Sequence, residues 1–201
     1  FYVDAMEVIN TTKNRIIFSD DFESGIVGET PGMDNPDMGT WDWNGLSIAE
    51  IAGTKDTEKM TAAEGSQYVN IARLTGRPKL TAIGDLNASD AGEEGDIVEI
   101  RFSFFFESGF ASIYPRSGDG DSAQITFFPD GEVRIYGGGD VGWNILDQSY
   151  TENQWNQVLI RYINGSGEYS ISVNGAELET YEGVSSEDNG KGGNLDGLRF
   201  Q

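Results

Sequence analysis

The sequence is a succession of short strand-like segments without a convincing amphipathic helix. Apolar residues recur at every second position over short runs, and clusters of Gly, Asp, Asn and Ser separate these runs. This spacing is typical of antiparallel strands in a sandwich, whereas a βαβ fold would place helical stretches between the strands. We therefore predict an all-β protein, an antiparallel β-sandwich (jelly roll) of two packed sheets with little or no helix. A chain of 201 residues can form one such domain.

Two hairpins are predicted from their turns. In the first, "PDG" at 129–131 combines the fixed φ of Pro with a Gly that tolerates positive φ, so the flanking runs should pair antiparallel. In the second, "NGSG" at 164–167 links two alternating runs. The core face of the second hairpin is predicted to carry Val158, Ile160 and Tyr162 with their partners Tyr169, Ile171 and Val173.

The run from Ile97 to Glu107 is predicted to be a central strand. One parity carries Ile100, Phe102, Phe104 and Phe106, which predicts a core face, and the other carries Glu99, Arg101, Ser103 and Phe105. The run "EVRIYG" alternates in the same way, with Arg134 and Tyr136 facing outward. If these two strands are neighbours, Arg101, Arg134 and Tyr136 share one outward surface.

The charge and the missing residue types exclude several functions. The chain has 34 acidic and 13 basic residues and a formal charge of −21, which disfavours nucleic acid and anionic membranes as partners. It contains no Cys and no His, which excludes disulfides, thiol nucleophiles, Cys/His zinc sites and His-based catalysis. No segment approaches the roughly 18 apolar residues of a membrane span, so membrane insertion is not expected.

The stretch "FSDDFESG" at 18–25 raises a specific question. Phe18 and Phe22 alternate with acidic residues and share their parity with Asp20, which leaves Asp21 and Glu23 on the other face. These carboxylates are either a solvated acidic edge or hard-oxygen ligands of a cation.

Three stretches carry a family resemblance. They are "IIFSDDFESGIVGETPG" (16–32), "ENQWNQVLIRYINGSGEYSISVNGAELETY" (152–181) and "NLDGLRF" (194–200). Together they resemble the concanavalin A-like lectin/glucanase jelly roll, in its laminin-G-like and carbohydrate-binding-module branch. The late hairpin is the most specific of the three, and the likeness covers most of residues 16–201.

The resemblance implies a calcium ion where the first and last strands of such folds meet. Carried over to this sequence, it nominates Asp21, Glu23 and Asp196 as metal ligands, with a plain acidic edge as the alternative. Calcium takes six to eight oxygen ligands in irregular geometry, which suits such a set. Calcium is the one cofactor that we expect.

The first nine residues, "FYVDAMEVI", also resemble a last strand, and "NTTKN" follows as a polar linker. We predict residues 1–15 to be an N-terminal strand and linker, and residues 16–201 to be the sandwich domain. The strand either closes a preceding domain in a tandem array or pairs with this domain or with a neighbouring copy. We expect it to be ordered against a sheet, since an uncovered apolar edge invites strand addition.

Exposed aromatic rings beside hydrogen-bonding side chains are what glycan-binding modules use. The first candidate for such a surface is Trp143 with Tyr136 and Arg134, and the second is Tyr114 with Arg116. Arg101 is a further candidate ligand-binding residue, because it is expected to share the outward surface of Arg134 and Tyr136. Trp155 matches the Trp of the family's late hairpin and is predicted to lie in the core.

Catalytic motifs are not found. No strand carries the paired carboxylates of glycoside hydrolases on this sandwich, and no lyase motif matches. The chain is therefore predicted to be a non-catalytic carbohydrate-binding or adhesion module with a structural calcium, extracellular or at the cell surface, with a polysaccharide or glycan as its partner. One alternative is a structural subunit of an extracellular fibre or surface array that contacts neighbouring copies through its N-terminal strand. A polysaccharide-degrading enzyme is the third hypothesis.

Overall fold

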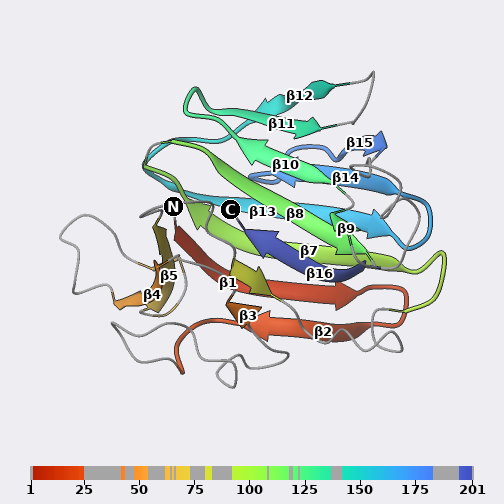
Figure 1. Ribbon diagram of the computed structural model, residues 1–201, viewed down its shortest axis with the longest axis horizontal. Coiled ribbons are helices and arrows are strands. Elements are labelled where there is room, and N and C mark those ends of the chain that lie inside the picture. Colours follow the sequence, from red (N-terminus) through yellow and green to blue (C-terminus); the bar gives the residue numbers. More distant parts are fainter. Residues whose placement is uncertain are drawn as a thin grey trace.

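The protein is a sandwich of two antiparallel sheets, in agreement with the predicted fold class. The computed structural model describes residues 2–24, 42–43, 48–53, 62–63, 65, 67–72, 80–82, 92–107, 109–117, 120–121, 123–136, 142–182 and 195–200. Within these residues two eight-stranded sheets form and no helix occurs. Accordingly, the described part of the chain contains no helix that could cross a membrane. In Figure 1, β8 and β16 of one sheet lie over β7 and β1 of the other.

We call the two layers sheet A and sheet B. Sheet A has the order β15-β14-β13-β7-β1-β5-β4, with β2 also paired to β1. Its strands are β1 (Tyr2–Asn10), β2 (Arg15–Asp20), β4 (Ile48–Gly53), β5 (Gln67–Ala72), β7 (Ile97–Phe105), β13 (Trp155–Ile163), β14 (Glu168–Val173) and β15 (Glu179–Glu182). Sheet B has the order β12-β11-β10-β8-β16-β6-β3, with β9 also paired to β8. Its strands are β3 (Asp42–Trp43), β6 (Leu80–Ala82), β8 (Ala111–Ser117), β9 (Gly120–Asp121), β10 (Gln124–Phe127), β11 (Glu132–Tyr136), β12 (Trp143–Ser149) and β16 (Leu195–Phe200).

The core lies between the inner faces of the sheets, and the aromatic face of β7 is at its centre. The predicted inward parity of β7 is confirmed, because Ile100, Phe102 and Phe104 are all buried. The ring of Phe104 lies 4.4 Å from that of Phe127 on β10, and Phe102 meets Phe200 on β16 edge to face at 5.7 Å. These contacts join the two sheets through aromatic area, the largest apolar surface that a side chain can bury.

Both predicted hairpins are present. β10 and β11 pair across the turn in which Gly131 has φ 83°, a conformation that only glycine adopts readily. β13 and β14 pair in the predicted register, with Val158 opposite Val173 and Tyr162 opposite Tyr169. The two tyrosine rings stack at 4.6 Å.

The N-terminal strand β1 lies inside sheet A rather than beside it. It pairs with β7 on one side and with β2 and β5 on the other. Val3, Met6 and Val8 are buried in the same core as the aromatic residues of β7. A bulge interrupts its pairing to β7 between Asp4 and Glu7, and Ala5 has φ 49° there. The strand is therefore part of the common core of this chain.

Candidate functional site

Four aromatic side chains gather on the outer face of sheet B. Phe110, Phe128, Tyr136 and Trp143 form what we call the aromatic platform. Tyr136 lies opposite Trp143 in the β11–β12 pairing, and their rings are 5.3 Å apart. Phe128 meets Trp143 edge to face at 6.0 Å and Phe110 at 5.1 Å. Trp143 is 41 % exposed and Phe110 66 %, so apolar area of the platform faces water.

A charged pair borders the platform. The guanidinium of Arg134 lies 4.0 Å above the centre of the Phe128 ring, in cation–π geometry. Its Nε donates to Glu132 Oε2 at 2.7 Å, and its Nη2 donates to the same oxygen. Both residues alternate with buried Val133 and Ile135 along β11, which is why they face outward. The ion pair fixes the guanidinium and leaves the platform near electrical neutrality.

The platform unites the first predicted group of ligand-binding residues. Arg134, Tyr136 and Trp143 lie close together, as predicted. Phe128 and Phe110, which were not predicted, lie beside them. Phe128 directly precedes the predicted "PDG" turn, and Phe110 precedes β8. Sequence analysis missed both because neither belongs to an alternating run that marks an outward face.

The second predicted group, Tyr114 and Arg116, lies on β8 of the same sheet. Tyr114 is only 8 % exposed and Arg116 is half-buried. Tyr114 therefore offers little ring surface for stacking. Next to it, Ser112 and Thr126 join β8 to β10 through a 2.8 Å hydrogen bond between their hydroxyls.

Arg101 lies on the other sheet. β7 belongs to sheet A and β11 to sheet B, so Arg101 does not share an outward surface with Arg134 and Tyr136. The condition that the two strands are neighbours is not met. The alternation of each strand shows only that its arginine points away from the core. Because both sheets have an outward face, it does not show that the two arginines share one.

Arg101 is instead part of a three-residue ion cluster. Glu99 Oε1 accepts from Arg161 Nε at 3.0 Å and Nη2 at 2.7 Å, and Glu99 Oε2 accepts from Arg101 Nε at 3.2 Å and Nη2 at 2.6 Å. Burial alone would raise the pKa of Glu99, but the hydrogen bonds and charges of the two arginines outweigh it and hold this pKa below its ordinary value. The carboxylate stays ionised and orients both guanidiniums.

The predicted calcium ligands occupy different places. Asp21 Oδ1 accepts from the Glu23 backbone N at 3.0 Å, and Glu23 Oε1 accepts from the Gln67 backbone N of β5 at 2.6 Å. These two residues follow β2, whose last residue, Asp20, pairs with Met6. Asp196 is the second residue of β16; its backbone position is described, but its side chain lies outside the described residues.

The backbone of Asp196 lies far from Asp21 along the strands. Leu195 N, at the start of β16, donates to Asn164 Oδ1 at 3.1 Å, and Asn164 N donates to Asp96 O. Asp96 is hydrogen-bonded to Asn10, the last residue of β1, whereas Asp20, the residue before Asp21, pairs with Met6 in the middle of that strand. In Figure 1, β2 ends on the left whereas β16 begins on the right.

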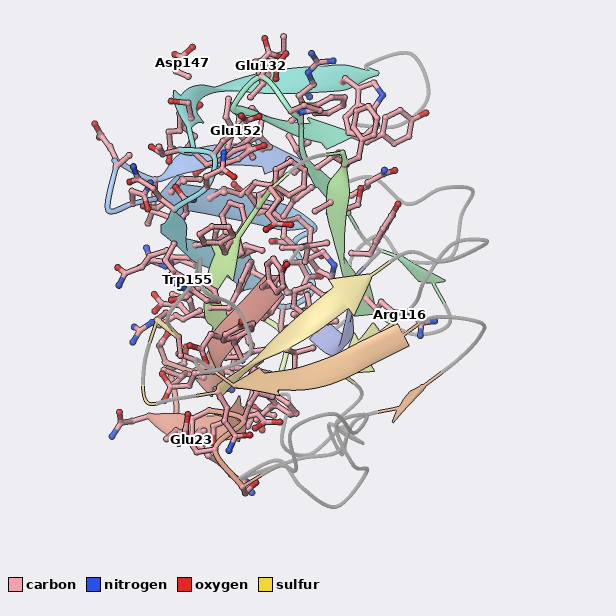
Figure 2. All side chains as sticks on the ribbon, turned by 90° about the vertical axis from the view of Figure 1, so that its left-hand side faces the viewer. Glu23, Arg116, Glu132, Asp147, Glu152 and Trp155 are labelled. Atoms are coloured by element: carbon pink, nitrogen blue, oxygen red, sulfur yellow. The ribbon has the colours of Figure 1, made fainter. Side chains whose placement is uncertain are left out.

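Arg116 pairs with Gly197, the residue after Asp196, and Figure 2 shows Arg116 and Glu23 well apart in a side view. The structure thus joins Asp21 to Glu23 and places the backbone at the start of β16 beside Asn164. Among the side chains described, no group of three acidic residues could hold a metal ion. Calcium stays a prediction.

The tyrosines with shifted pKa values are not poised to act as bases. Burial, the charge of Glu107 and a hydrogen bond to it raise the pKa of Tyr2 to about 12. Burial and nearby carboxylates also raise the pKa values of Tyr150 and Tyr181. A general base must lose its proton near the working pH. These hydroxyls instead stay protonated, and Tyr150 donates to Phe128 O at 2.5 Å.

The chain has little similarity to known proteins. No family model matches the chain, and no curated protein matches it. Among solved structures, the galectin LEC-6 of Caenorhabditis elegans is similar over 51 % of this chain and 73 % of that chain, with 17 % identity and a TM-score of 0.39. A likeness at this level assigns no function. The two-sheet sandwich is established by the strand pairing itself.

Proposed function

We propose that the protein is a non-catalytic carbohydrate-binding module that holds a glycan on the aromatic platform. The observation that carries this proposal is the exposed Trp143 ring, set against Tyr136 and Phe128 on the outer face of sheet B. Sugar rings have an apolar face that packs on such rings, and their hydroxyls pair with polar groups at the margin. Arg134 and Glu132 supply a donor and an acceptor there.

The charge of the protein indicates which glycans to expect. With a formal charge of −21, the chain repels polyanions, and the Arg134 guanidinium is already neutralised by Glu132. We therefore propose a neutral glycan rather than a uronic acid or sulfated polymer. An extracellular or cell-surface location and a role in adhesion follow from this proposal, because polymeric glycans are met there.

The fibre-subunit alternative loses its main support. It requires a terminal strand that is available to a neighbouring copy, whereas β1 lies between β7 and β2 in its own sheet and buries Met6 and Val8 in its own core. Donating this strand would open the sandwich.

The test is retention of the protein on a panel of insoluble neutral polysaccharides, with Trp143→Ala as the variant. Ile145→Ala is the matched control, since Ile145 lies on the same strand and is 56 % exposed but has no ring. Truncating a central aromatic contact costs about 2 kcal/mol, or about thirtyfold in affinity. We expect that loss in Trp143→Ala and near-native retention in Ile145→Ala. Unchanged retention by a folded Trp143→Ala variant would refute the platform.

A further inference from the structure

A groove crosses the outer face of sheet A, on the opposite side of the sandwich from the platform. It consists of two adjoining hollows of about 560 Å³ and about 450 Å³ that share Ser103, Gln157 and Gly175 as lining residues. Both volumes fall in the range of roughly 300–1,000 Å³ that is usual for ligand sites. We propose that this groove, which we call the sheet A groove, is a second saccharide-binding site.

An aromatic side chain forms one end of the groove. Trp155, the first residue of β13, lines the smaller hollow and is half-buried. Its ring meets Tyr68 at 5.9 Å and Phe105 at 5.7 Å, both near edge-to-face. Trp155 was predicted to lie in the core. It packs, half-buried, against a second buried cluster formed by Tyr68 and Phe105, which is separate from the main core between the sheets. This packing holds the indole in place beside the groove, and Figure 2 shows it on the side of the molecule away from Arg116.

The larger hollow is lined by hydrogen-bonding side chains on adjacent strands. Arg101 and Ser103 come from β7, Gln157 from β13 and Glu7 from β1. Register places Ser103 opposite Gln157, so the two lie side by side on the floor. A polyhydroxylated ligand needs both donors and acceptors at close intervals, and this row provides them.

Arg101 is preorganised for contact with a ligand. Its Nε and Nη2 are both held by the buried carboxylate of Glu99, while its Nη1 lies 3.9 Å from Glu7 Oε2. The Arg101 side chain remains 49 % exposed. A donor that is already oriented loses less conformational entropy on binding than a mobile one.

The charge balance in the groove selects against anions. The larger hollow is lined by one arginine, Arg101, and by the acidic residues Glu7, Asp20 and Asp21, while the neighbouring Arg161 pairs with Glu99. No surplus positive charge is left to attract a carboxylate or sulfate ligand. The aromatic end, the polar floor and the lack of surplus positive charge together fit a neutral oligosaccharide that is long enough to reach from Trp155 to Arg101.

Two sites on opposite faces would allow one chain to bridge two glycan strands. The platform lies on sheet B and the groove on sheet A, and they share no residue. The groove proposal does not rest on the platform, so each can fail without the other.

The test is calorimetric titration with a panel of neutral hexasaccharides (cellohexaose, xylohexaose, laminarihexaose and mannohexaose), with oligogalacturonate as the anionic probe. Gln157→Ala removes a groove side chain, and Gln154→Ala is the control because Gln154 is exposed just before β13 and does not line the groove. Losing one side-chain hydrogen bond reduces affinity by about three- to tenfold. Trp155→Ala should remove groove binding altogether, and unfolding curves of all three variants test whether each is folded.

We expect a neutral probe to bind with a component that Gln157→Ala weakens and that Gln154→Ala and Trp143→Ala leave intact. Two components, one sensitive to Trp143→Ala and the other to Gln157→Ala, would support both sites. If all binding is lost in Trp143→Ala and none changes in Gln157→Ala, the platform is supported and the groove is refuted. If all binding is weakened in Gln157→Ala and none changes in Trp143→Ala, the groove is supported and the platform is refuted. Failure of every neutral probe, or preference for oligogalacturonate, would overturn the groove proposal.

Discussion

The ion cluster on the outer face of sheet A gives the most quantitative prediction, for Glu99→Gln. The Glu99 side chain is 6 % exposed and accepts four hydrogen-bonding contacts from Arg101 and Arg161, whose side chains are 49 % and 38 % exposed. In the Gln variant one oxygen becomes an NH₂ group that faces guanidinium donors. The substitution therefore removes charge-assisted hydrogen bonds and sets donor against donor.

The expected cost follows from these exposures. Hydrogen bonds to charged groups contribute about 1.5–3 kcal/mol each, and breaking a fully buried ion pair costs about 3–5 kcal/mol. Because both guanidiniums can regain water, we expect a smaller loss of about 2–3 kcal/mol in the free energy of unfolding. For a chain of this size each kcal/mol lowers Tm by about 2–4 °C, so Tm should fall by about 4–12 °C at pH 7.

The pH dependence has a defined sign. The pKa of Glu99 is lower in the folded protein than its ordinary value, because the arginine contacts outweigh the effect of burial. The contribution of Glu99 to the free energy of unfolding is therefore fully present above its unfolded-state pKa, and it is lost as the pH falls through its folded-state pKa. The stability difference between the native protein and Glu99→Gln should be large at pH 7 and shrink below about pH 4.

The assay is guanidinium chloride and thermal unfolding at pH 7 and pH 3. Glu132→Gln is the matched control, since Glu132 also pairs with an arginine on its own strand but is 37 % exposed; it should cost less than about 1 kcal/mol. Equal losses in the two variants, or a Glu99→Gln loss that persists unchanged at pH 3, would refute the reasoning.

Three further predictions follow from the fold. Met6→Ala should lower the free energy of unfolding by about 2–5 kcal/mol, measured by denaturant unfolding, because Met6 is 1 % exposed in the core; native stability in this variant would mean that β1 is peripheral. The sequons at Asn10 and Asn164 should carry no glycan in folded protein from a glycosylating host, as read by mass spectrometry, because both side chains are buried and hydrogen-bonded; an occupied site in a folded fraction would contradict this. If calcium raises Tm, Asp21→Asn and Asp196→Asn should not both abolish the shift, because the start of β16 is linked through Asn164 and Asp96 to Asn10, whereas Asp21 follows the Asp20–Met6 pair; loss in both would restore the predicted shared site.

Local sequence patterns were sufficient for everything that depends on one strand or one tight turn. The alternation in 97–107 indicated which side chains of β7 face the core, and the turn at 164–167 set the register of β13 on β14. The physical reason is that side-chain direction in a strand has a period of two, and a short turn fixes the pairing of the strands it joins. The grouping of Arg134, Tyr136 and Trp143 also follows from neighbouring strands in sequence.

The assignment of each strand to a sheet was decided by tertiary structure. β7 pairs with β13 and β1, which are distant in sequence, so Arg101 lies on the opposite face from Arg134. The same long-range order separates Asp196 from Asp21 and turns Trp155 outward beside Tyr68. Period-two alternation shows whether a side chain points toward the core or away from it. The same alternation occurs in both sheets, so it does not show to which sheet a strand belongs. The order of non-local strands depends on how the whole set of apolar faces is buried together, which no single segment encodes.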